Sequence, residues 1–105
     1  MQIQINTDSN VEGRERLAAY VNGVVEDALG RFRERLTQVE LHLRDNDGHK
    51  GSLNHKSCMM SARLKGRQPI VVTNQGATMN DALSGAIDKL KRSLESEIDR
   101  LQEHR

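Results

Sequence analysis

The residues best suited to chemistry are lysines and arginines that recur at helical spacing in the last third of the chain. Lys89 and Arg92 are three residues apart, and Ser96 and Arg100 continue the row at steps of four. Residues three or four apart lie on one side of an α-helix, so this spacing predicts a basic stripe. Lysine and arginine bind phosphates without reading bases. The stripe therefore indicates a surface for RNA or for another acidic partner.

A row of apolar residues beside that stripe predicts how the helix is positioned. The row recurs at steps of four and three, as on one face of a helix, and comprises Leu83, Ile87, Leu90, Leu94, Ile98 and Leu101. Thr78 precedes the row and is suited to cap the helix. A helix with one apolar face and one basic flank packs on a sheet and leaves its cations facing outward.

The chain before this helix predicts four strands and one further helix. Ile3 and Ile5 alternate with polar residues as in a strand, and Ser9 with Glu12 fits a capping box that begins a helix. The apolar stripe of that helix comprises Leu17, Val21, Val24, Val25, Ala28 and Phe32. Alternating runs predict three more strands, at residues 38–44, 57–65 and 69–73. Residues 45–54 are polar and contain glycine, so they predict a loop.

The element order β-α-β-β-β-α predicts an α+β fold, in which two helices pack on one face of a four-stranded, mostly antiparallel sheet. A length of 105 residues fits one domain over residues 1–105. One tyrosine, one phenylalanine and no tryptophan imply an aliphatic core. They also leave few aromatic platforms for stacking single-stranded bases, so recognition by base stacking is not expected.

Cysteine usage and hydropathy indicate a cytoplasmic protein. The single cysteine, Cys58, excludes an internal disulfide and suits a reducing compartment. No apolar stretch approaches the roughly 20 residues that span a bilayer. Residues 1–6 contain neither a basic leader nor an apolar signal core.

Positive charge is concentrated in the middle of the chain, although the formal net charge is only +1. Residues 37–69 carry six cations, namely Arg44, Lys50, Lys56, Arg63, Lys65 and Arg67, against three acids, namely Glu40, Asp45 and Asp47. The imbalance places the electrostatic footprint on the middle strands. From this charge count, the candidate RNA-binding residues of the strands and their turn are Arg44, Arg63, Lys65 and Arg67.

Several short motifs follow one another in the order found in a known family. Residues 87–94 read Ile-Asp-Lys-Leu-Lys-Arg-Ser-Leu, residues 31–32 are Arg-Phe, and segment 44–58 contains Asp-Asn-Asp-Gly and then Lys-Ser-Cys. Together they resemble the ribosome hibernation-promoting factor family, which includes the ribosome-associated inhibitor proteins, over nearly the whole chain. The chain departs from the pattern after residue 94, where Glu95 and Glu97 stand in place of further bases.

The resemblance implies a double-stranded-RNA-binding-domain-like fold without catalysis or a cofactor. Members of the family bind the small ribosomal subunit in the channel used by messenger and transfer RNA, and so keep idle ribosomes inactive. Lys89 and Arg92 match positions that are basic in the family, and we add Arg31 and Arg100 as candidate RNA contacts. Long members pair ribosomes through an extra domain that this sequence lacks, so we expect a monomer off the ribosome.

Two other functions stay open on the sequence alone. Helices of balanced charge beside a basic strand face would suit a protein-interaction module that docks on an acidic partner. A generic double-stranded RNA binder would instead recognise the shape of any A-form duplex. Salt-dependent binding to small subunits separates the first of these from a hibernation factor, and competition by a free duplex separates the second.

A metal site or an enzyme active site is not expected. The metal-ligating residue types are His42, His49, His55 and Cys58, and their spacing matches no standard zinc finger. Even His55 and Cys58, three apart, would point to opposite faces of a strand. The sequence shows no nucleophile with a neighbouring base and no phosphate-binding glycine loop after a strand, so it gives no sign of catalysis.

Overall fold

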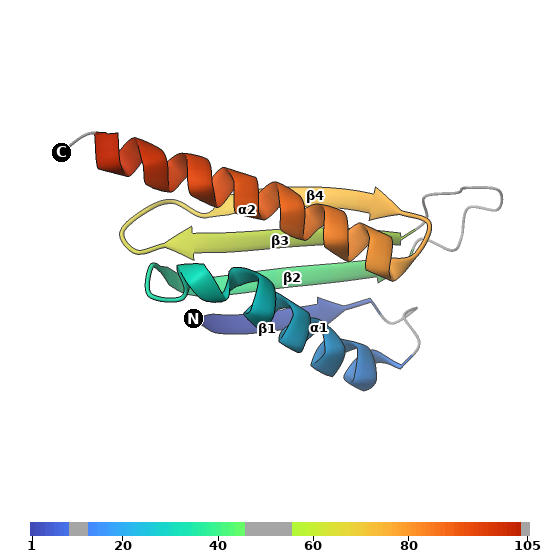
Figure 1. Ribbon diagram of the computed structural model, residues 1–105. Helices are drawn as coiled ribbons and strands as arrows, with labels where there is room; N and C mark the ends of the chain where they lie inside the picture. Colours follow the sequence, from blue (N-terminus) through green and yellow to red (C-terminus); the bar gives the residue numbers. More distant parts are fainter. Residues whose placement is uncertain (9–12, 46–55, 104–105) are drawn as a thin grey trace.

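The computed structural model describes residues 1–8, 13–45 and 56–103. Its elements are β1 (Gln2–Thr7), α1 (Arg14–Leu29), a 3-10 helix η1 (Gly30–Phe32), β2 (Leu36–Asp45), β3 (Lys56–Leu64), β4 (Ile70–Gly76) and α2 (Met79–Glu103). The four strands lie in the order β1-β2-β3-β4, and both helices cover the same face of the sheet (Figure 1). The predicted α+β fold and its element order are confirmed.

The sheet is mixed, with one parallel pair of strands and two antiparallel pairs. β1 pairs with β2 in parallel, whereas β2 with β3 and β3 with β4 are antiparallel. A parallel pair needs a crossover connection, which α1 supplies. Val39, Leu41 and Leu43 of β2 stand opposite Ala62, Met60 and Cys58 of β3, and all six are buried. Side chains alternate along a strand, so the residues between them lie on the face that no helix covers.

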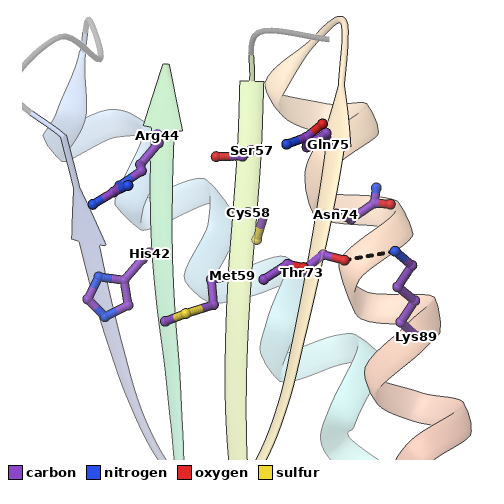
Figure 2. A pocket seen from close by; sticks show the side chains of 9 residues that line it. All are labelled: His42, Arg44, Ser57, Cys58, Met59, Thr73, Asn74, Gln75 and Lys89. Carbon is purple, nitrogen blue, oxygen red and sulfur yellow. Dashed lines mark hydrogen bonds between the residues drawn. The ribbon is translucent and has the colours of Figure 1, made fainter. Parts of the chain in front are cut away.

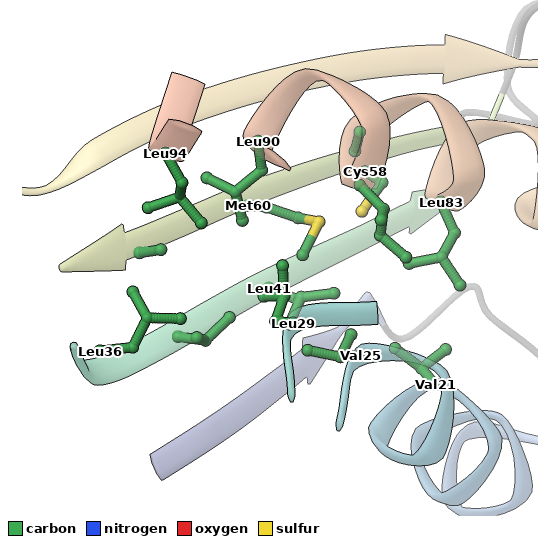
Figure 3. Packing of buried hydrophobic residues seen from close by; sticks show 14 of the residues in the cluster. Val21, Val25, Leu29, Leu36, Leu41, Cys58, Met60, Leu83, Leu90 and Leu94 are labelled. Atoms are coloured by element: carbon green, nitrogen blue, oxygen red, sulfur yellow. The ribbon is translucent and has the colours of Figure 1, made fainter. Parts of the chain in front are cut away.

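The core lies between the helices and the sheet and is almost entirely aliphatic, as predicted (Figure 3). Leu83, Leu90 and Leu94 of the predicted α2 row are buried, and Ile98 packs at its margin. From α1, the row contributes Val21 and Val25. Leu29 was not among the predicted core residues of α1 but is fully buried at its C-terminal end (Figure 3).

Both ends of the first helix differ in detail from the sequence prediction. α1 begins at Arg14 and its N-cap is Gly13, which makes no side-chain capping bond and has φ +63°, a conformation that favours glycine. The predicted capping box, Ser9 with Glu12, lies outside the described residues. Phe32, assigned to the same helix from its spacing, belongs instead to η1.

The predicted polar loop between the second and third strands, residues 45–54, begins one residue later than predicted. Asp45 is the last residue of β2, and it forms an ion pair with Lys56, its register partner at the start of β3. The rest of that loop lies outside the described residues. Of the helices that the structure describes, none is long and apolar enough to cross a membrane.

Candidate nucleic-acid interface

The first turns of α2 are fixed to the edge strand β4, and this sets which residues of the helix face outward. The Thr78 side chain caps the helix as predicted, since its Oγ1 accepts a hydrogen bond from the Asp81 backbone N–H at 3.0 Å. Asn74 of β4 donates through Nδ2 to the carbonyl oxygens of Asp81 and Ala82, at 3.3 and 3.2 Å. A Cβ on Gly85 would lie 2.0 Å from Asn74 Nδ2, so glycine allows this close approach.

Lys89 lies where α2 crosses the edge of β4. Its Nζ donates to the Thr73 carbonyl oxygen at 2.8 Å, and the side chain remains exposed (Figure 2). Because β4 is an edge strand, this carbonyl points away from the sheet and toward the helix flank. The contact holds the ammonium group beside the sheet edge while leaving two of its three N–H donors for a ligand.

An open groove of about 810 Å³ at this end of the sheet is lined by both Lys89 and Arg44 (Figure 2). Arg44 lies on the uncovered face, because its neighbour Leu43 points into the core. Polar residues such as His42, Ser57 and Gln75 also line the groove, together with the apolar Met59. One predicted residue of the helix and one of the strands thus line the same groove from opposite sides, with β3 and β4 between them (Figure 2).

A second group of predicted residues lies at the other end of α2, beside the turn between β3 and β4 (Figure 1). Arg67 Nη2 donates to Glu97 Oε1 at 2.9 Å, and Arg100 Nη2 donates to Oε2 of the same carboxylate. Arg63 donates through Nε to the Arg67 carbonyl oxygen at 3.0 Å. Arg92 lines the same shallow depression as Glu97 and Arg100. Two of the predicted cations, Arg67 and Arg100, thus contact one carboxylate, while Arg63 bonds the backbone of Arg67.

Glu97 is ionised in this surrounding. The hydrogen bond from Arg67 has the largest effect and lowers the pKa of the Glu97 carboxyl. Desolvation opposes it, and the charge and hydrogen bond of Arg100 lower the pKa further. With two guanidinium groups on one carboxylate, the trio keeps one net positive charge. The β3–β4 turn that presents Arg67 depends on Gly66, whose φ of +73° disfavours residues with a side chain.

Arg31 does not join either group. Its guanidinium forms an ion pair with Glu95 and lies over the Phe32 ring, with Cζ 4.6 Å from the centroid. Glu95 therefore faces η1, on the flank of α2 opposite the one that faces β4. Lys65 is exposed in the β3–β4 turn, where its backbone N–H donates to the Arg35 carbonyl at 2.9 Å.

Sequence reasoning missed the roles of Glu97 and Asn74. Glu97 and Arg100 are three apart on a helix, a spacing that favours an ion pair, so half of the Glu97 contact was visible in the sequence. Its contact with Arg67 joins residues 30 positions apart and depends on how α2 crosses the sheet. Nothing in the sequence indicated that Asn74 binds α2, because a polar residue in an alternating run is ordinary for a strand.

The structure places the metal-ligating residue types apart where it describes them. His42 lies on the uncovered face, whereas Cys58 is buried beneath the helices. Burial raises the pKa of the Cys58 thiol to about 12, so the thiolate that binds metals is not formed at neutral pH. No group of three or more histidine, cysteine or acidic residues in the described part of the chain could hold a metal ion. His49 and His55 lie outside the described residues.

These features define a small α+β domain that presents arginine and lysine on one flank of its last helix and along the neighbouring sheet edge. The chain belongs to the Sigma 54 modulation protein / S30EA ribosomal protein family, whose model matches residues 3–102. This match confirms the predicted family resemblance and indicates a ribosome-associated modulation factor.

Two solved structures are similar to the chain. A ribosomal subunit interface protein from Coxiella burnetii superimposes with a TM-score of 0.71 at 17% identity, over 94% of this chain and 99% of that one. The N-terminal domain of Protein Y from Thermus thermophilus gives 0.69 at 18% identity, over 91% and 98%. At these identities the likeness shows a shared fold. A search of curated proteins finds no match to this chain.

Proposed function

We propose that this protein is a ribosome hibernation factor that occupies the messenger and transfer RNA channel of the small ribosomal subunit. It binds there through the flank of α2 that faces β4, hereafter the β4 flank, which carries Lys89, Arg92 and Arg100. Arg67 extends this surface from the β3–β4 turn, and Arg44 extends it onto the uncovered face. The function needs shape and charge but no catalytic group.

The observation that carries the proposal is the position of the acids that follow residue 94. In the sequence, Glu95 and Glu97 stand where the family pattern continues with bases, and they would weaken an RNA-binding helix. In the structure, Glu95 is paired with Arg31 on the opposite flank, and Glu97 is shared by two arginines. The β4 flank of α2 therefore keeps a net positive charge in spite of both acids.

A ribosomal RNA partner would make binding depend strongly on salt concentration. Folded ribosomal RNA presents closely spaced phosphates, and each phosphate neutralised by lysine or arginine releases counterions. With three or four such contacts, a plot of the logarithm of the binding constant against the logarithm of the salt concentration should have a slope of about −2 to −4. The Coxiella neighbour is described as a ribosomal subunit interface protein, which supports a ribosomal partner for this fold.

The proposal is tested by sedimentation of the purified protein with isolated small subunits across a salt series, with a free RNA duplex as competitor. We expect co-sedimentation that weakens as salt increases and survives an excess of duplex. Co-sedimentation that the duplex abolishes would indicate generic double-stranded RNA binding. Absence of co-sedimentation even at low salt would exclude the hibernation function and favour a module that docks on an acidic protein.

A further inference from the structure

The Glu97 carboxylate lies between two guanidinium groups that reach it from different elements. Arg67 comes from the β3–β4 turn and bonds Oε1, while Arg100 comes from the next turn of α2 and bonds Oε2. The carboxylate is largely enclosed, with its side chain 15% exposed, whereas the side chains of Arg67 and Arg100 are 48% and 68% exposed. The anion is thus covered, and the cations around it remain open to solvent.

This arrangement is also the one in which arginines bind a phosphate. A carboxylate and a phosphodiester each offer two acceptor oxygens on one charged centre, and the planar guanidinium fits both in the same way. We infer that Arg67 and Arg100 form a binding site for a backbone phosphate of RNA, and that the Glu97 carboxylate occupies this site in the free protein. The inference rests on the proposed function and concerns how its binding surface is regulated.

The site is already shaped before any RNA arrives. The Arg63 guanidinium holds the Arg67 carbonyl oxygen at 3.0 Å, and Gly66 supplies the left-handed turn residue that precedes Arg67. Each guanidinium carries five N–H donors, and the contacts with Glu97 use one from each. A phosphate can therefore approach both arginines without a change in the backbone.

Exchange between carboxylate and phosphate is energetically accessible because both arginines are exposed, and solvent weakens ion pairs that it can reach. While Glu97 holds the two arginines, they attract RNA with one net charge instead of two. The carboxylate therefore competes with RNA inside the protein, lowers the affinity and reduces the number of counterions released on binding. Removal of the carboxylate should strengthen binding, whereas loss of a residue that supports the site would weaken it.

The test compares Glu97→Gln with Glu95→Gln. Both substitutions remove one negative charge from α2, but only the first releases the candidate phosphate site. Binding of the wild type and both variants is measured on isolated small subunits, and on a 20-base-pair RNA duplex, across a salt series. Thermal melts followed by circular dichroism establish that all three proteins are folded.

We expect Glu97→Gln to bind small subunits roughly five- to tenfold more tightly than the wild type, since each released exposed pair corresponds to a factor of up to about five. Its salt slope should be steeper by about one unit, for the one additional phosphate contact. Glu95→Gln should change the affinity less than about twofold, with no change in slope.

Equal strengthening by both variants would overturn the inference, because net charge alone would then explain it. Weaker binding by Glu97→Gln would also overturn it, because the carboxylate would then support the surface. If no protein binds small subunits, the proposed function fails, and the duplex series still decides the inference. In the duplex series, tighter and more salt-dependent binding by Glu97→Gln alone supports exchange of the carboxylate for a phosphate. Equal binding by all three proteins contradicts it.

Discussion

The two flanks of α2 carry the same types of residue and differ in how charge is compensated. On the flank toward η1, Glu95 pairs with Arg31, one acid with one base. On the β4 flank, Glu97 is shared by Arg67 and Arg100. The pair on the first flank is neutral, whereas the trio on the β4 flank keeps one positive charge, although each contains one acid.

The effect of each acid after residue 94 depends on its place around the helix. Glu95 and Glu97 are two positions apart, so they lie about 200° apart around the axis and meet different neighbours. A helix can therefore stay balanced in total charge and still present cations to one side. Stability should therefore depend on the buried row of α2, on the attachment of α2 to β4 and, less strongly, on each acid.

The largest effect on stability is expected from the buried row that both flanks share. Leu90 is fully buried on the side of α2 that faces the sheet, so Leu90→Ala should lower the free energy of unfolding by about 2–5 kcal/mol. Ile98→Ala, in the same row but only partly buried, should cost less. Chemical denaturation measures both, and an equal cost would contradict the packing of α2 described above.

A smaller effect is expected from the bonds that fix α2 to β4. Asn74→Ala removes two hydrogen bonds to α2 carbonyls and should lower the free energy of unfolding by about 1–3 kcal/mol. Gly85→Ala would push the same side chain aside, so the two costs should not add in the double variant. Full additivity in denaturation experiments would show that Gly85 and Asn74 act independently.

Acid should weaken the β4 flank through Glu97. Its folded-state pKa is lowered, chiefly by the hydrogen bond from Arg67, so its contribution to stability is present above the ordinary glutamate pKa of 4.5. That contribution is lost as pH falls through the lowered value, because the unfolded chain takes up the proton first. Stability measured from pH 6 to pH 2 should fall more steeply for the wild type than for Glu97→Gln. Parallel profiles would contradict the pairing.

The smallest effect is expected on the flank toward η1. Glu95→Gln removes an ion pair between groups that are about half exposed, and such pairs contribute between about 0 and 1 kcal/mol. Denaturation should therefore detect little or no change. A loss of more than about 2 kcal/mol would show that this flank is held by Glu95 and not by the buried row.

Most of the fold could be predicted from the sequence because its signals are local and periodic. The α2 row and the alternation in β2 and β3 fixed the buried face of each element, and Thr78 marked where α2 begins. The start of α1 at Arg14, after a glycine in a left-handed conformation, Gly13, gave no such local signal.

The candidate site was predictable only in part. The stripe Lys89, Arg92 and Arg100 followed from helical spacing, but the partners of the cations did not. Arg31 looked equivalent to Arg67 in the sequence, and only the packing of η1 and of the β3–β4 turn against α2 separates them. Such contacts join residues far apart in the chain, and neither charge counts nor periodicity can reveal them.

The central claim is that the β4 flank of α2 binds the small ribosomal subunit. It is tested most directly by comparing Lys89→Glu/Arg92→Glu with Arg14→Glu/Arg16→Glu, which changes net charge equally at the exposed start of α1. Sedimentation with small subunits should show a loss of affinity of about 100-fold or more for the first pair, whose reversed charges oppose phosphates, and only a few-fold loss for the second. Equal losses for both pairs, or unchanged binding for the first, would contradict the claim.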